Sequence, residues 1–488
     1  MGNSPHITSI NILNDDSLLH VFYLYQPFCL GEDQRENEYA RRFGGDEQWV
    51  GERWWHKIAH VCQRWRNLVL GSAYYLDVCL LCTYGTPIAD ILAHSPPLPL
   101  AIDYHFDVLH PRSYPSAEDE EGAIQALKQR DRVRRVRLQM PITSLQKLIV
   151  AIDEEYPILE YLIITRTCEF IGNDTTVIFP KTFQAPKLRH LTNPSAAIPI
   201  SSRLLPTAAG MVRLCLRIVH PSTYLQPNTL LQWLSFMPQL ETLILSAAST
   251  LGVEEQLMHT PIMTPVTLPN LYRFTFSGAD AYLEAFLRRI TSPHLKKLDI
   301  DFNKSQYSVP YLLQFINATE TLRFDSAKVM FTMGNVCVTF YLRGETNTYA
   351  ISIAVWVHES QLSSMAQILT SLSQSFAVVE HLTLGLDTEG HFLSEAQSEV
   401  DRTEWRKLLR SFGNVKTLWI DNRLVEELSR CLQLDDGELC LKLLPDLQEL
   451  TYYGGGNTGD GFTSFIDARQ NAGRPIALAR CSERWPRR

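Results

Sequence analysis

The sequence has no apolar run long enough to cross a membrane, because none of its stretches reaches about 18 consecutive apolar residues. Its first residues, MGNSPHITS, lack the charged segment and apolar core of a secretory signal. The 10 cysteines are scattered without paired spacing, which argues against a disulfide framework. We therefore expect free thiols, no membrane partner, and a location in the cytoplasm, the nucleus or both.

An excess of positive charge is also absent. The chain has 45 Lys and Arg against 53 Asp and Glu, a formal net charge of −8, which argues against a nucleic-acid partner. One basic run, residues 128–137, follows an acidic run at residues 118–121. We interpret the two runs as neighbouring solvated faces that balance each other.

Motifs for metal binding are incomplete. Cys79 and Cys82 form one CxxC pair, but no second pair of zinc ligands accompanies them. His56 and His60 are spaced to share a metal on a helix, yet no glutamate of an HExxH motif lies between them. We expect no metal site.

The chain contains the glycines of a nucleotide-binding motif but not the other parts of that motif. Residues 454–459 read GGGNTG and satisfy GxGxxG, but no second strand with an acidic ribose ligand follows them. A flexible turn before the last helix is the simpler interpretation. We predict no cofactor, no catalytic residue and a binding protein; a doubly wound α/β cofactor-binding enzyme is the alternative.

Two amphipathic helices are predicted near the N-terminus. Residues 54–68, WWHKIAHVCQRWRNL, place apolar side chains on one face of a helix. Residues 10–25 form a second such pattern, which Asn14, Asp15 or Asp16 can cap. Because two short helices cannot bury two apolar stripes alone, the pair needs a partner.

This pair of segments resembles an F-box, the module by which substrate receptors of cullin-based ubiquitin ligases bind a Skp adaptor. The likeness rests on Leu13, Asp15, Leu18, Leu19 and Phe22, and then on Val61, Cys62, Trp65, Arg66 and Leu68. Asn14 stands where the family usually has proline, and a polar insert of about residues 26–50 separates the helices. Fungal F-box-like proteins share both departures, and residues 83–87, 98–100 and 465–475 also resemble that group.

The resemblance implies a Skp adaptor as partner and, through it, a cullin. The adaptor-binding residues that it implies are Leu13, Leu18, Leu19, Phe22, Ile58, Val61, Cys62, Trp65 and Leu68.

From about residue 130, a strand motif of the form apolar-x-x-Leu-x-apolar returns at intervals of about 23 to 36 residues, which resembles leucine-rich repeats. Its middle residues are Val136, Leu162, Leu191, Leu214, Leu243, Phe274, Leu298, Leu322, Leu382, Leu418 and Leu450. A further repeat at Ile351, Ile353 and Val355 fills the longest gap. Helices are expected between the strands, at residues 143–154, 280–290, 307–316, 360–376, 402–412 and 462–471.

These patterns predict an α/β chain in which a helical F-box-like module precedes an irregular solenoid of parallel strands with an antiparallel excursion near residues 329–357. The predicted boundaries are 7–75 for the module, 76–109 for a junction, 110–479 for the solenoid and 480–488 for a basic tail. The junction is expected to carry strands around Val78 and Leu100 and a helix at residues 87–94. Regular short gaps favour a solenoid over a doubly wound core.

The solenoid is expected to bind an unknown protein substrate through side chains that alternate with the inward apolar positions. The candidates are Asp299, Arg323, Trp356, Thr383 and Trp419, with Thr275 and Thr451 on the same side. Trp356 and Trp419, taken as two repeats apart, would lie about 10 Å from each other. The predicted function is the substrate-recognition subunit of a Skp–cullin–F-box ligase; a leucine-rich-repeat scaffold without ligase coupling is the alternative.

Overall fold

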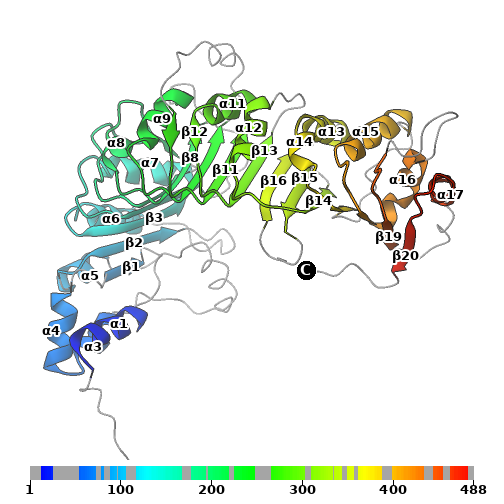
Figure 1. The fold of residues 1–488 in the computed structure, drawn as a ribbon. Helices are drawn as coiled ribbons and strands as arrows, with labels where there is room; N and C mark the ends of the chain where they lie inside the picture. The colour runs from blue at the N-terminus through cyan, green and yellow to red at the C-terminus, as the bar shows by residue number, and fades with distance from the viewer. Residues whose placement is uncertain are drawn as a thin grey trace, which may run out of the picture. The chain divides into compact units, whose positions relative to one another are not determined.

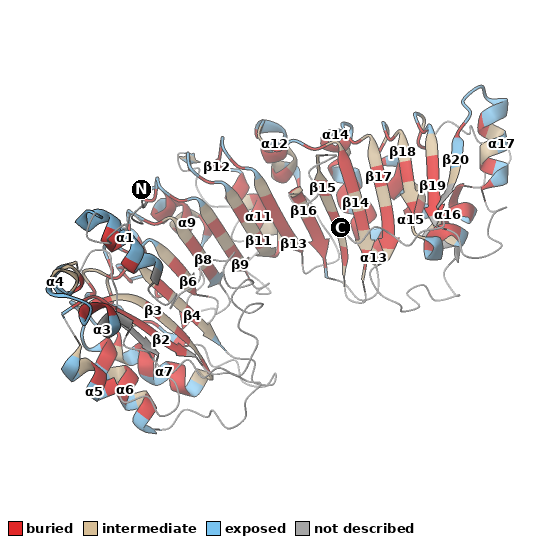
Figure 2. Cartoon of the chain, turned by 90° about the horizontal axis from the view of Figure 1, so that it is seen from below, coloured by how far each residue is buried: buried red, intermediate tan, exposed pale blue. Residues whose placement is uncertain are grey.

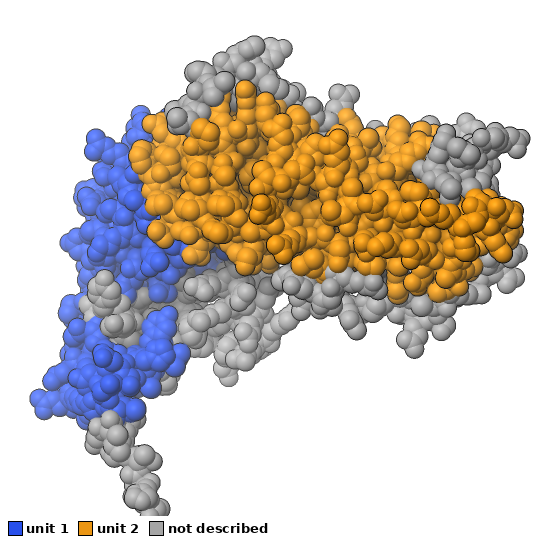
Figure 3. Space-filling view, in the orientation of Figure 1, with its two compact units in different colours: residues 1–223 blue, residues 224–488 orange. Residues whose placement is uncertain are grey.

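The computed structural model divides the chain into two compact units, residues 1–223 and 224–488 (Figure 3). The structure describes residues 13–25, 54–72, 78–81, 88–95, 97–105, 117–166, 177–193, 196–218, 225–247, 265–302, 309–332, 335–342, 349–356, 361–386, 398–432, 443–453 and 462–481. Cys82, the polar insert, the GGGNTG segment and the basic tail beyond Cys481 lie outside these residues.

Unit 1 begins with a helical module made of α1 (Asp15–Tyr25), α3 (Trp54–Ala59) and α4 (Gln63–Gly71). The prediction of a single helix over residues 54–68 is wrong, because the helix is interrupted between the end of α3 at Ala59 and the start of α4 at Gln63. Cys62 has φ −159° and ψ 171°, an extended conformation in which it precedes the first turn of α4 as its N-cap residue. Apolar spacing alone did not reveal this break, because both helices keep apolar side chains at helical intervals.

The sheet of unit 1 consists of parallel strands in chain order. They are β1 (Val78–Leu81), β2 (Leu100–His105), β3 (Val133–Met140), β4 (Tyr161–Arg166), β6 (His190–Asn193) and β8 (Arg213–Ile218). The intervening helices are α5 (Ile88–His94), α6 (Ala117–Leu127), α7 (Ile142–Ala151) and α8 (Leu204–Thr207), and β5 (Val177–Ile178) pairs separately with β7 (Ala196–Ala197). Since β1 pairs with β2 and β2 pairs with β3, the expected junction supplies the first strands of the array.

The sheet of unit 2 has the order β9-β11-β13-β16-β15-β14-β17-β18-β19-β20. Its strands are β9 (Thr242–Ala247), β11 (Arg273–Gly278), β13 (Lys297–Phe302), β14 (Ser326–Phe331), β15 (Val336–Tyr341), β16 (Tyr349–Val355), β17 (His381–Leu386), β18 (Thr417–Ile420), β19 (Glu449–Tyr453) and β20 (Ala477–Cys481), and β10 (Val266–Thr267) pairs with β12 (Ile290–Thr291). Its helices are α9 (Pro227–Leu234), α11 (Asp280–Leu287), α12 (Pro310–Ala318), α13 (Gln361–Ser371), α14 (Ser373–Phe376), α15 (Ser398–Arg410), α16 (Val425–Leu432) after the short η3 (Asn422–Leu424), and α17 (Thr463–Asn471). Within unit 2, α9, α11, α12, α13 and α15 lie over one face of the sheet (Figure 1).

The predicted repeat register is confirmed by the strand pairing. The markers pair in series as Val136–Leu162–Leu191–Leu214 in unit 1, and as Leu243–Phe274–Leu298 and Leu382–Leu418–Leu450 in unit 2. All of these side chains are buried, and they alternate with less buried neighbours along the strands (Figure 2). The described part of the chain is therefore a repeat scaffold of strand–helix units, and most of its strand pairs are parallel.

The marker at Leu322 is wrong. Residues 322–325 form no strand, and the backbone N–H of Arg323 donates to the carbonyl of Thr321 in a turn. The chain instead passes on to β14 and returns through the antiparallel strands β15 and β16, so that Ile351 pairs directly with Leu298. The antiparallel excursion and the repeat at Ile351 are thus confirmed, and α13 then leads to β17 beyond β14.

The doubly wound alternative is contradicted by the strand order. In such a fold the order reverses at the middle of the sheet, where the ligand binds. Here the strands follow the chain in unit 1, and in unit 2 they depart from chain order only within the antiparallel excursion.

A buried carboxylate links two neighbouring repeats of unit 2. Both oxygens of Glu284 on α11 accept backbone N–H groups at the first turn of α12, from Tyr311 at 2.7 Å and from Leu312 at 2.9 Å. Burial raises the pKa of Glu284 from 4.5 to about 7, although these two hydrogen bonds act in the opposite direction.

Because the pKa of Glu284 is higher in the folded than in the unfolded chain, its protonation favours folding. We expect this contribution to be complete below pH 4.5 and to be lost as the pH rises to about 7, by at most about 3 kcal/mol. Glu284→Gln should remove this part of the pH dependence in urea unfolding between these values. Glu320→Gln, the same change at an exposed position, is the control, and equal pH profiles for the two variants would contradict the prediction.

Candidate protein-binding surfaces

The helical module has a small core of its own. Leu18 and Phe22 of α1 are fully buried, and Ile58 of α3 and Val69 of α4 are buried with them. The Phe22 ring meets the Trp65 ring edge to face, with 4.9 Å between centroids. The apolar stripes of the module's helices therefore pack mainly against one another.

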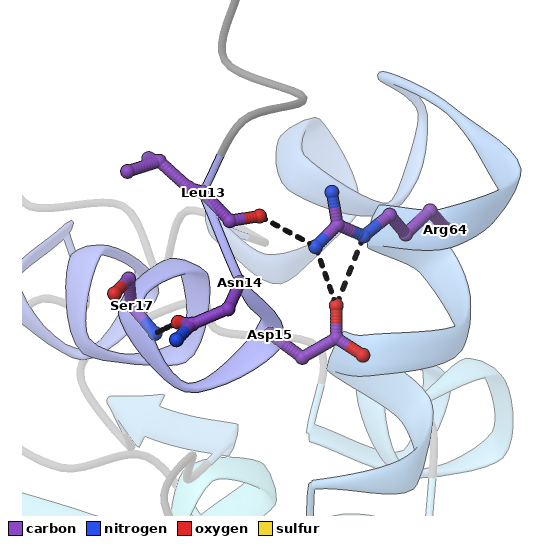
Figure 4. Close-up of polar contacts among 5 residues, drawn as sticks. All are labelled: Leu13, Asn14, Asp15, Ser17 and Arg64. Carbon is purple, nitrogen blue, oxygen red and sulfur yellow. Dashed lines mark hydrogen bonds and ion pairs between the residues drawn. The ribbon is translucent and has the colours of Figure 1, made fainter.

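Polar contacts hold the start of α1 against α4 (Figure 4). The side chain of Asn14 accepts the backbone N–H of Ser17 at 2.8 Å, so Asn14 caps the start of α1. The Arg64 guanidinium donates to Asp15 at 2.6 and 2.9 Å and to the carbonyl of Leu13 at 2.7 Å. Since the Arg64–Asp15 pair is largely exposed, it contributes less than about 1 kcal/mol.

The predicted adaptor-binding residues fall into three classes of burial. Leu18, Leu19, Phe22 and Ile58 are buried inside the module as core residues, and their contact with an adaptor stays a prediction. Trp65 and Leu68 are half-buried. Leu13, Val61 and Cys62 are exposed and remain available for a partner.

Other apolar side chains of the module are exposed and were missed by sequence reasoning. Val21 is 43% and Leu24 59% exposed on α1, and Leu70 is 41% exposed on α4. Val61, a predicted contact in the turn between α3 and α4, is 58% exposed as well. Val21 and Leu24 are three residues apart, which places them on one side of α1. A helical stripe shows that a residue is apolar, but not whether the domain or a partner covers it.

In unit 2, the predicted substrate residues lie mostly in one row across the sheet. The ladder runs Thr275–Asp299–Ser352–Thr339–Lys328–Thr383–Trp419–Thr451. Asp299, Thr383 and Trp419 therefore lie in one row, and their side chains point to the face of the sheet opposite the buried markers. Arg323 is outside this row, because it lies in the turn before β14. Whether this row binds a substrate stays a prediction.

The expected closeness of Trp356 and Trp419 is wrong. Trp356 follows β16 and is 53% exposed, but β15, β14 and β17 lie between β16 and β18. Four strand spacings separate the two tryptophans by at least about 19 Å. The distance between the two tryptophans depends on the order of the strands in the antiparallel excursion, and counting repeats along the sequence does not reveal that order.

A hydrogen-bonded cluster lies at one end of this row. Asp299 accepts from Arg273 Nε at 3.2 Å and from the Thr275 hydroxyl at 3.1 Å. Burial and the neighbouring Asp299 raise the pKa of Tyr349 to about 12, and burial with the charge of Asp299 raises the pKa of Asp301. The cluster is internally satisfied, which indicates an ordered surface more than a proton-transfer site.

No group of three or more metal-ligating side chains occurs among the described residues. None of the described helices is long and apolar enough to cross a membrane.

Comparison with known proteins gives little information. No family model and no curated protein matches the chain. Among solved structures, the leucine-rich repeat-containing protein LegL7 from Legionella pneumophila is similar, with 12% identity and a TM-score of 0.24 over 82% of this chain and 99% of that chain. A TM-score this low carries no weight, so the assignment of repeats rests on the strand register.

Proposed function

We propose that the chain is the substrate-recognition subunit of a Skp–cullin–F-box ubiquitin ligase. In this proposal the helical module binds a Skp adaptor and the repeat scaffold binds a protein substrate. The protein itself carries out no bond chemistry. It raises the local concentration of the substrate at the ligase.

The observation that carries the proposal is the combination of a closed core with exposed apolar side chains in the helical module. Exposed single apolar residues are ordinary, but six large ones among the described residues of so small a module are many for a surface with no partner. They are Leu13, Val21, Tyr23, Leu24, Val61 and Leu70. Val21, Leu24, Val61 and Leu70 are therefore the residues that we assign to the adaptor contact. The F-box resemblance of Leu13, Asp15 and Leu18 supplies the identity of the partner.

The test is co-purification of the full chain with a Skp adaptor expressed in the same cells. We expect a stable complex, and we expect Val21→Asp with Leu24→Asp to weaken it at least about tenfold, because charges would be buried at an apolar contact. Both positions are exposed, so the variant should fold.

The matched control is Thr463→Asp with Ser464→Asp. It adds the same charge at exposed positions in the first turn of α17, where acidic side chains are favourable. A wild-type chain that captures no Skp adaptor, or a module variant that captures it as well as the control, would overturn the proposal and favour a scaffold without ligase coupling.

A further inference from the structure

A row of cationic and aromatic side chains crosses the sheet of unit 1. Arg135 on β3, Tyr161 on β4, His190 on β6 and Arg213 on β8 pair in register. The rings of Tyr161 and His190 are stacked, with 4.3 Å between centroids and 4° between planes. The guanidinium carbon of Arg135 lies 4.6 Å from the centre of the Tyr161 ring.

These side chains point away from the helices. Their neighbours along the strands, such as Val136, Leu162, Leu191 and Leu214, are buried, and strand side chains alternate between the two faces. The row therefore belongs to the face of the sheet opposite the buried markers.

Arginines outnumber carboxylates among the described strand residues of this face. Arg137 lies beside the row on β3, and Arg217 is exposed on β8, two alternate positions beyond Arg213. Among the described strand residues that point to this face, Asp103, which pairs with Arg137, is the one carboxylate. Burial, together with the charges of Arg189, Arg213 and Arg135, lowers the pKa of His190 to about 4, so this imidazole is neutral at physiological pH.

The stack determines what kind of anion the row fits. One face of Tyr161 is turned to His190 and Arg135 lies over the ring, so Tyr161 offers no free face to a ligand. Nucleobases bind by stacking on free ring faces, and the chain as a whole is acidic at −8, so nucleic acid is disfavoured. Guanidinium groups instead bind carboxylates through paired hydrogen bonds.

We propose that this face of unit 1 binds an acidic segment of a protein partner. Arg135 and Arg213 are three strand spacings apart, about 14 Å, and an extended peptide covers this distance in about four residues. Two glutamates at positions i and i+4 point to the same side of such a peptide and would engage the two arginines. The inference rests on the repeat array being the substrate-binding part of the proposed receptor, and it requires no adaptor.

The experiment measures binding of fluorescent peptides to the full chain by polarisation. One flexible peptide carries glutamates at i and i+4, a second carries glutamines, and a third carries phosphoserines at the same positions. We expect the glutamate peptide to bind at least about tenfold more tightly than the glutamine peptide, and its affinity to fall with added salt. Tight binding of the phosphoserine peptide alone would overturn the assignment to carboxylates.

Variants locate the site. Arg135→Gln with Arg213→Gln should weaken binding of the glutamate peptide at least about tenfold, since both charges that it contacts are removed. Lys181→Gln with Lys187→Gln removes the same charge at exposed positions before β6 and should change binding less than about twofold. If the glutamine variant does not fold by circular dichroism, Arg135→Lys with Arg213→Lys replaces it, and we expect a smaller loss because the paired hydrogen bonds are lost and the charge is kept.

Equal binding of the glutamate and glutamine peptides, or equal losses in the site and control variants, would overturn the inference. So would a single-stranded oligonucleotide that displaces the peptide at comparable concentration. Because the measurement contains no adaptor, its failure leaves the proposed adaptor contact untouched, and the Val21→Asp, Leu24→Asp variant should bind the peptide normally.

Discussion

Arg469→Met is expected to lower the free energy of unfolding of unit 2 by about 3–5 kcal/mol. The Arg469 side chain on α17 is 1% exposed, and its guanidinium donates to the carbonyl oxygens of Leu444, Pro445 and Leu447 at 3.0, 3.0 and 3.1 Å. Methionine fills much of the same volume but donates nothing, so three acceptors in the turn before β19 lose this donor. Carbonyl groups that lose a charged donor in a buried site carry the full cost of desolvation.

The backbone of that turn adds to the cost. Leu444 has φ 47°, in the left-handed region that residues other than glycine occupy only at a cost of about 1–2 kcal/mol. We infer that the three bonds from Arg469 hold the turn in this conformation and thereby fix the start of β19. Arg469→Lys should recover only part of the loss, because an ammonium group lacks the planar fork that reaches several carbonyls.

Urea unfolding of the full chain, followed by tryptophan fluorescence, measures the effect of Arg469→Met. Arg474→Met is the matched control, since Arg474 is mostly exposed and lies 3.9 Å from Asp446, and it should change the free energy by less than about 0.5 kcal/mol. A loss below about 1 kcal/mol in Arg469→Met would show that solvent replaces the lost donors.

The strands of the array could be predicted because their signal is local and repeated. A leucine that is buried against the helices recurs in nearly every repeat, and the paired residues of neighbouring strands are the ones that the spacing selected. The marker at Leu322 shows the limit of this signal. Leu322 and Phe324 have the right spacing, but strand pairing is a property of the neighbouring chain segment, and here β16 occupies the place beside β13.

The charged runs were harder to interpret from sequence. Residues 118–121 were expected to balance residues 128–137, but they lie within α6, where Asp119 is buried. Glu120 accepts from Ser144 and Lys147 of α7, both at 2.6 Å, and Arg130 pairs with Asp153 and Glu154. Charge runs predict exposure on average, and the partners of individual charges depend on which repeats stack together.

For the candidate sites, the sequence allowed us to predict which side of the sheet a residue lies on, but not which residues strand pairing brings together. Strand alternation placed Asp299, Thr383 and Trp419 on one side of the sheet, and the structure confirms that they share a row. The basic and aromatic row of unit 1 was missed, because Tyr161, His190 and Arg213 are distant in sequence and come together only through strand pairing. A search for polar or aromatic residues one position before each leucine marker would have found them.

The helical module should lose most of its stability in Phe22→Ala, by about 3–5 kcal/mol. The Phe22 side chain is 1% exposed and contacts the Trp65 ring edge to face, so its removal leaves a cavity and ends the aromatic contact. Trp65 is half-buried and keeps part of its surface in water. We therefore expect Trp65→Ala to cost less than Phe22→Ala, although tryptophan is the larger residue.

Hydrogen exchange of the amides in α1, α3 and α4 measures this effect without requiring the rest of the chain to unfold. Phe22→Ala should abolish protection in these helices and leave the strands of the array protected. The core of three short helices is small, so the loss of one large buried side chain removes much of its stability. Leu24→Ala, at an exposed position on the same helix, should leave exchange unchanged and still weaken the proposed adaptor contact. Unchanged protection in Phe22→Ala, or a larger loss of protection in Trp65→Ala, would show that Trp65 and not Phe22 is the centre of the module's core. The apolar stripe of α1 would then again be the expected adaptor contact.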